Sequence, residues 1–181
     1  MDDAEIERWR NKNLERVIAR AIESCTADTP EDDAELKFLL GGPHGKPIAL
    51  GILEFPAPAR HAVRRGAPLW LPFGGKEYLL YELVTDRSDL GLARVKNLLD
   101  AGWDPNIALP GTGRTALMQV VNNSTPANRA MVALLLTAGA DTTQASASGL
   151  TVFDDAPTVM REFIRAALDD LHRDPTGRKR A

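Results

Sequence analysis

The sequence predicts an all-α fold, namely a solenoid of about four helix-turn-helix units behind an N-terminal helical cap. Apolar residues recur at helical spacing through most of the chain, and two kinds of glycine marker recur with one period. A glycine opens an apolar segment at positions 75, 113 and 149, with spacings of 38 and 36 residues. A glycine ends an apolar segment at positions 66, 102 and 139, with spacings of 36 and 37 residues. Two markers with a common period indicate one supersecondary unit used several times.

Residues 1–42 are expected to form the N-terminal capping pair of helices. The run Thr-Pro-Glu-Asp at 29–32 combines a helix cap, a first-turn proline and an acidic first turn. The second helix is expected to carry Leu36, Phe38, Leu39 and Leu40 and to stop at Gly41. The apolar residues of the first helix fall mainly on one face: Ile6, Trp9, Leu14, Val17, Ile18, Ala21 and Ile22.

Residues 43–172 are expected to hold the repeated units, and the segment 113–139 shows one unit most clearly. Thr115 can cap a first helix, and Thr125 can cap a second helix with Pro126 in its first turn. The polar run 122–125 separates the two helices. Gly139 ends the second helix, because a left-handed terminal residue is least strained as glycine.

A weaker copy of the unit precedes it, and a single helix follows. Residues 45–53 are expected to form a short first helix and residues 59–65 its partner, with Pro56 and Pro58 marking the turn between them. The apolar cluster at 69–73 is expected in a loop. Residues 159–171 form a closing amphipathic helix, and residues 173–181 are expected to be a disordered tail.

These residues resemble the ankyrin-repeat family. The family's second helix ends in a leucine pair followed by Gly-Ala-Asp, and residues 135–141 read Leu-Leu-Thr-Ala-Gly-Ala-Asp. Residues 98–106 match nearly as well, and residues 113–117 are similar to the Gly-x-Thr-Pro-Leu start. The family's proline is replaced by Tyr78, Ala116 and Val152, and its histidine by Leu80, Met118 and Asp154, which predicts a less regular geometry.

The resemblance implies binding of a partner protein through a concave surface made of loop tips and first-helix faces, without chemistry of its own. Exposed Trp and Arg are enriched at binding hot spots. Trp70 and Trp103 either contact the partner or pack over neighbouring loops. The candidate partner-binding residues are Trp70, Phe73, Lys76, Trp103, Ile107, Leu109, Arg114, Asn122 and Asn123.

The chain is also similar to small bacterial ankyrin proteins, some of which neutralise toxins as immunity proteins. This resemblance implies a partner that is a toxin or an effector, blocked by coverage of its active site. The alternative interpretation is a regulatory or scaffold subunit of an enzyme or a secretion system. A third interpretation is a small enzyme whose active site the sequence does not reveal.

Composition favours a cytoplasmic protein that binds neither membrane nor nucleic acid. The formal net charge of −3 gives no general attraction to polyanions. No apolar run approaches the roughly 20 residues that a membrane helix needs, and residues 1–5 are acidic where a secretory signal is basic. The single cysteine, Cys25, is expected to be a buried and unreactive thiol.

Motifs for catalysis, metal and cofactor binding are weak, so no cofactor and no metal site is predicted. The run 41–47 resembles a phosphate-binding loop but has Pro47 in place of the Ser or Thr that binds magnesium. Three histidines and one cysteine give no metal-ligand spacing. The pairs at 154–155 and 169–170 are expected on solvated helix faces. A basic cluster of Arg60, Arg64 and Arg65 contacts an acidic protein, contacts nucleic acid, or is simply solvated.

Overall fold

The computed structural model describes residues 3–26 and 30–173, with side chains described for residues 12–25 and 32–173. The prediction of an all-α fold is confirmed for this part of the chain, which contains an isolated β-bridge between Ala108 and Thr115 but no strand. Of the predicted tail, residues 174–181 lie outside the described residues. The elements are α1 (Asp3–Thr26), α2 (Pro30–Gly41), α3 (Gly45–Leu53), α4 (Pro56–Arg64), the 3₁₀ turn η1 (Leu71–Phe73), α5 (Lys76–Leu83), α6 (Asp89–Asp100), α7 (Ala116–Val120), α8 (Pro126–Thr137), α9 (Val152–Asp155) and α10 (Thr158–Arg173).

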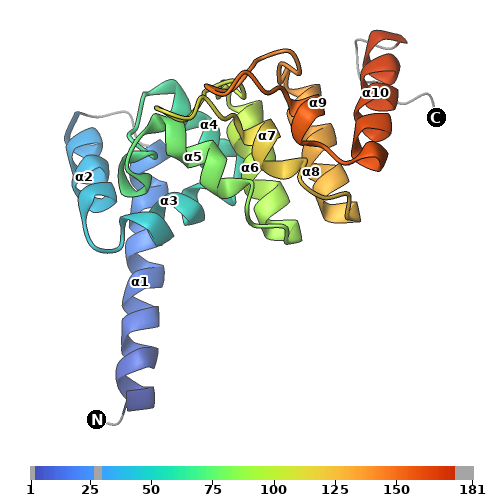
Figure 1. The fold of residues 1–181 in the computed structure, drawn as a ribbon. Helices are drawn as coiled ribbons and strands as arrows, with labels where there is room; N and C mark the ends of the chain where they lie inside the picture. The colour runs from blue at the N-terminus through green and yellow to red at the C-terminus, as the bar shows by residue number, and fades with distance from the viewer. Residues whose placement is uncertain (1–2, 27–29, 174–181) are drawn as a thin grey trace.

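The helices α3 to α10 follow one another in a row of antiparallel pairs, as Figure 1 shows. The second helices form one layer, in which α4 packs on α6, α6 on α8 and α8 on α10. The shorter first helices form the other layer, in which α5 packs on α7 and α7 on α9. Within the row, α3, α5 and α7 also pack on their own partners α4, α6 and α8, so these helices bury apolar surface both inside a pair and between pairs.

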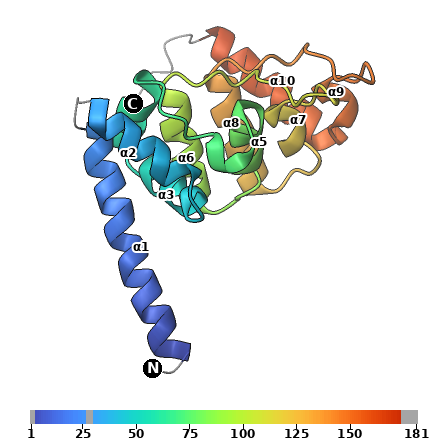
Figure 2. The same ribbon diagram turned by 90° about the vertical axis from the view of Figure 1, so that its left-hand side faces the viewer.

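Helix α1 covers the start of this row. It packs against α2, α3 and α4 through its C-terminal half, while its N-terminal half extends away from all other described helices (Figures 1 and 2). Gly51 permits the close approach to α3, because a Cβ at this position would lie 2.6 Å from Cγ2 of Ile18. No helix of the described residues has both the length and the apolar character required to cross a bilayer.

The same helix stop occurs three times along the row. Gly66, Gly102 and Gly139 have φ angles of 70°, 97° and 90°, in the left-handed region that favours glycine. The amide that follows each glycine donates to a carbonyl five residues earlier, at 2.9, 3.3 and 3.0 Å respectively. This hydrogen bond defines a Schellman-type C-terminus. The glycines that the sequence predicts as helix stops therefore have that conformation.

The predicted helix starts at Thr115 and Thr125 are also confirmed. Oγ1 of Thr125 accepts a hydrogen bond from the Asn128 amide at 3.2 Å, and Oγ1 of Thr115 accepts one from the Met118 amide at 3.4 Å. Ser88 caps α6 in the same way. Each cap satisfies a backbone donor that the first helical turn leaves without an intrahelical partner.

The first unit differs from its prediction at the start of α4. The helix begins at Pro56 rather than near Ala59, and Pro56 and Pro58 lie in its first turn instead of marking the connection before it. A proline in the first turn loses no hydrogen bond, because its missing N–H would have no helical acceptor. The loop predicted at 69–73 contains the short turn η1.

The core runs continuously along the row, and two buried amides are part of it. Nδ2 of Asn97 donates to the carbonyl of Leu53 at 2.9 Å, and Nδ2 of Asn128 donates to the carbonyl of Val120 at 2.5 Å. Both acceptors lie at helix C-termini, where carbonyls have no intrahelical donor. These asparagines, which lie in α6 and α8, therefore hold the ends of the first helices α3 and α7 against the layer of second helices.

Candidate partner-binding surface

Exposed aromatic and aliphatic side chains gather around the N-terminus of α5. Nζ of Lys76 lies 5.9 Å from the ring centroid of the half-buried Trp70, a distance at which a cation is attracted to the ring. Leu71 and Tyr78, which lie beside this pair in the sequence, are each 36% exposed. The structure thus brings together two of the predicted residues, Trp70 and Lys76, and leaves two residues exposed in the same segment that the sequence did not single out.

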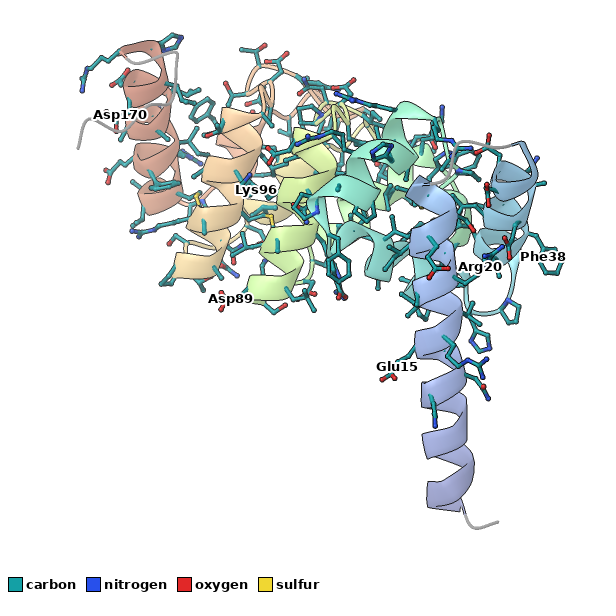
Figure 3. All side chains as sticks on the ribbon, turned by 180° about the vertical axis from the view of Figure 1, so that it is seen from behind. Glu15, Arg20, Phe38, Asp89, Lys96 and Asp170 are labelled. Carbon is teal, nitrogen blue, oxygen red and sulfur yellow. The ribbon has the colours of Figure 1, made fainter. Side chains whose placement is uncertain are left out.

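Phe38 extends this surface onto α2. Its side chain is 80% exposed and points into solvent (Figure 3). With Leu71, Gly41 and Gly42 it lines a hollow of about 470 Å³. We call the set Phe38, Trp70, Leu71, Lys76 and Tyr78 the aromatic edge. Leu36, Leu39 and Leu40 are spaced so that they share one face of the helix, and Phe38 falls outside that face. This spacing could have predicted the exposure of Phe38 from the sequence.

Phe73 is a core residue and not part of an exposed surface. Its side chain is only 7% exposed, and Nζ of Lys46 lies 5.1 Å from its ring centroid. The turn η1 directs Phe73 inward while Trp70 and Leu71 remain accessible. This placement corrects the prediction of Phe73 as a contact residue.

Ile107, Leu109 and Arg114 share one hairpin loop before α7. The amide of Leu109 donates to the carbonyl of Arg114 at 2.8 Å, and the amide of Gly113 donates to the carbonyl of Leu109 at 2.9 Å. Gly113 has a φ of 64°, which this turn requires. Ile107 and Leu109 are half-buried, so the loop has a defined shape and keeps part of their apolar surface accessible.

Trp103 packs mainly against the protein itself. It is half-buried against the core, and its Nε1 atom is buried without an acceptor among the described residues. A partner cannot reach a buried indole N–H without movement of the loop. Of the two interpretations of Trp103, the structure favours packing over a neighbouring loop.

Arg114 joins two adjacent units. Nη1 donates to Oδ2 of Asp155 at 2.7 Å, and Nη2 donates to the carbonyl of Met118 at 3.0 Å. Burial opposes the charge of the guanidinium, but Tyr81 and Asp155 outweigh it, so the pKa of Arg114 lies above its usual value. Asp155 is therefore an ion-pair partner, which corrects its prediction as part of a solvated face. Its neighbour Asp154 caps α9 through Thr151.

A series of polar contacts connects the first helices to one another. Lys46 of α3 pairs with Glu82 of α5, and Oη of Tyr81 in α5 donates to Oε1 of Gln119 in α7 at 2.8 Å. The contact of Arg114 with Asp155 then connects the loop before α7 to α9. These polar groups bind their neighbours, so they hold the first helices in register.

Asn122 and Asn123 are exposed, at the opposite end of α7 from Arg114. Oδ1 of Asn123 accepts a hydrogen bond from the amide of Thr125 at 3.3 Å, so this residue shapes the turn into α8. No contact brings Asn122 or Asn123 to the aromatic edge.

The groups considered for chemistry or charge recognition have ordinary structural surroundings. Cys25 is buried, as predicted, and burial raises the pKa of its thiol to about 12. Among the described residues, no three His, Cys, Asp or Glu side chains lie close enough to hold a metal ion. In the predicted basic cluster, Arg65 forms an ion pair with Asp33 at 2.6 Å, while Arg60 and Arg64 are exposed.

The Arg114→Ala variant is expected to lose about 1–2 kcal/mol of stability, because it leaves the partly buried Asp155 without its cation. Chemical denaturation of the single variants and of Arg114→Ala/Asp155→Ala measures the coupling between the two residues. Lys76→Ala is the control, with an expected change within about 0.5 kcal/mol. Equal effects of the Arg114 and Lys76 variants would exclude a structural role for the ion pair.

No protein-family model matches this chain, and comparison with curated proteins found no similar sequence.

Proposed function

We propose that this chain is a protein-binding module that engages a partner protein through the aromatic edge. The observations that carry the proposal are the contact of Lys76 with Trp70 and the exposed side chains of Phe38 and Leu71, which line one hollow. A few residues carry most of the binding energy at protein interfaces, and Trp and Tyr are enriched among them. An adjacent cation favours a partner surface that combines apolar groups with carboxylates.

We further propose that the row of helix pairs is an ankyrin-type solenoid. Support comes from the three equivalent helix stops, the threonine caps of first and second helices, and the hairpin loop before α7. In such arrays the polar contacts between first helices keep the binding surface rigid, which lowers the entropic cost of association. In its most specific form, the proposal is that the partner is a toxin and that this surface covers the active site of the toxin.

Trp70→Ala is expected to weaken binding of the partner at least about 30-fold, the usual effect at an interface hot spot. The partner is first captured from cells of the native host with the full chain and identified by mass spectrometry. Its dissociation constant is then measured by calorimetry with the purified chain. Lys76→Glu is the second test, because this exposed residue can change without loss of core packing.

Two control variants make the result specific. Val159→Ala removes a side chain that is 51% exposed on α10, far along the row from the aromatic edge, and should leave the affinity unchanged. Trp103→Ala should lower the thermal midpoint, because Trp103 packs on the core. The proposal fails if every captured protein binds the Trp70→Ala and Lys76→Glu variants as tightly as it binds the parent chain.

A further inference from the structure

The outer face of α2 is an apolar surface at the N-terminal end of the row. Helix α2 packs against α1, α3 and η1, and Phe38 points away from these elements (Figure 3). Ala34, Phe38 and Gly41 are exposed and lie four and three residues apart, so they form one line along the helix. Among the large hydrophobic side chains of the described residues, Phe38 is the most exposed, at 80%.

The opposite end of the row has a different surface. Most of the exposed residues of α10 are polar or charged, and Val159 and Ala166 are the exceptions. The terminal units of helical arrays need such a polar outer face to remain soluble. The apolar outer face of α2 therefore favours association with another surface.

The outer face of α2 combines a protruding side chain with a space that can receive one. Phe38 is the protruding side chain. The space is the hollow of about 470 Å³ described above, which is lined beside Phe38 by Ala34, Lys37, Gly41, Gly42 and Leu71. A cavity of roughly 150 Å³ can hold a benzene molecule, so the hollow has room for a phenyl ring.

A two-fold axis would bring each ring to the hollow of a second copy. In a two-fold pair, a patch meets its own equivalent, so that each contact occurs twice. Antiparallel α2 helices can then place Phe38 of each copy over Gly41 and Gly42 of the other copy. Glycine has no side chain, so a ring can approach its backbone closely. In the same arrangement, Lys37 of each copy lies near the C-terminus of the other α2, where the helix dipole attracts a cation.

We propose that two copies of this chain associate through the outer face of α2, with the Phe38 ring of each copy in the hollow of the other. The interface is small, so the dimer is weak and reversible. Phe38 and Leu71 also belong to the aromatic edge. The second copy therefore competes with the partner protein for this surface, and this consequence rests on the proposed function.

Sedimentation equilibrium of the full chain without a partner is expected to show a reversible monomer–dimer equilibrium, with a dimer of twice the 19.7 kDa chain mass. Phe38→Ala is expected to raise the dimer dissociation constant at least about tenfold, because it removes both inserted rings. Gly42→Leu is expected to weaken the dimer as well, because the new side chain fills the hollow. A Cβ at position 42 makes only ordinary contacts, so this variant should keep its fold.

An equimolar mixture of the two variants tests the exchange of rings directly. Phe38→Ala keeps the hollow open, and Gly42→Leu keeps the ring. A mixed dimer therefore forms one ring-in-hollow contact, and the introduced leucine faces the space that the missing ring leaves. The mixture is expected to associate more tightly than either variant alone. Non-specific adhesion of an exposed phenylalanine would give no such recovery.

Phe55→Ala provides the matched control. Phe55 is 50% exposed at the start of α4 and does not line the hollow, so its loss should leave the dimer intact. Trp70→Ala and Lys76→Glu should also leave the dimer intact, because neither residue lines the hollow. These two variants test the proposed function, so its failure can be distinguished from failure of the dimer.

Circular dichroism checks that each variant retains its helical content. A chain that stays monomeric up to about 1 mM overturns the dimer. A dimer that Phe38→Ala leaves unchanged, or a mixture of the two variants that shows no recovery, overturns the proposed arrangement.

Discussion

The Leu98→Ala variant is expected to lose about 2–5 kcal/mol of unfolding free energy. Leu98 has an exposure of 0% in α6, and α6 packs against α3, α4, α5 and α8. The cavity left by the truncated side chain therefore lies where consecutive helix pairs meet. The surrounding helices are fixed by other contacts and fill such a cavity only in part. The free energy of the remaining cavity therefore adds to the free energy lost with the buried side chain.

Urea denaturation followed by circular dichroism measures this loss. Leu90→Ala is the control in the same helix, because its side chain is 44% exposed, and its stability should stay within about 0.5 kcal/mol of the parent. Similar losses for the two variants would mean that α6 does not hold Leu98 at the centre of the core.

Gly45→Ala is expected to destabilise the chain by about 2–3 kcal/mol through a steric clash. A Cβ at this position would lie 2.0 Å from the carbonyl oxygen of Leu40 and 3.2 Å from Cβ of Pro72. The first neighbour is backbone at the end of α2 and cannot rotate away. The variant would therefore displace α2 from α3.

Gly42→Ala is the nearby control for this effect. Its Cβ would lie 3.5 Å from the carbonyl oxygen of Leu39, an ordinary contact. No loss of stability is expected there, because alanine also restricts the unfolded chain more than glycine does. Thermal and urea unfolding of both variants test the difference, and a larger loss at Gly42 than at Gly45 would contradict the packing of α2 on α3.

The helical class and most helix limits could be predicted because local chemistry determines them. Gly66, Gly102 and Gly139 stop helices by their own conformational freedom, and Thr115 and Thr125 cap helices with their own hydroxyls. These signals act within a few residues. The start of α4 was misplaced because proline is compatible both with a turn and with a first helical turn.

The candidate surface was less predictable, because exposure depends on packing between segments distant in sequence. Trp70 and Phe73 are close neighbours of similar character, yet η1 leaves the first accessible and buries the second. Arg114 is of a residue type that is common at binding hot spots. Its partner within the chain, Asp155, lies 41 positions later in the sequence. Sequence spacing alone does not identify such a pair.

The one-directional order of the helix pairs has a thermodynamic consequence. Among the described residues, a pair inside the row has neighbours on both sides, whereas the four-residue α9 and α10 have neighbours on one side only. The free energy of local opening therefore rises from the α10 end toward the middle of the row. Unfolding of the α10 end alone costs only a small part of the total unfolding free energy. The part of the chain that carries Trp70 and Tyr78 keeps its shape while the far end opens and closes.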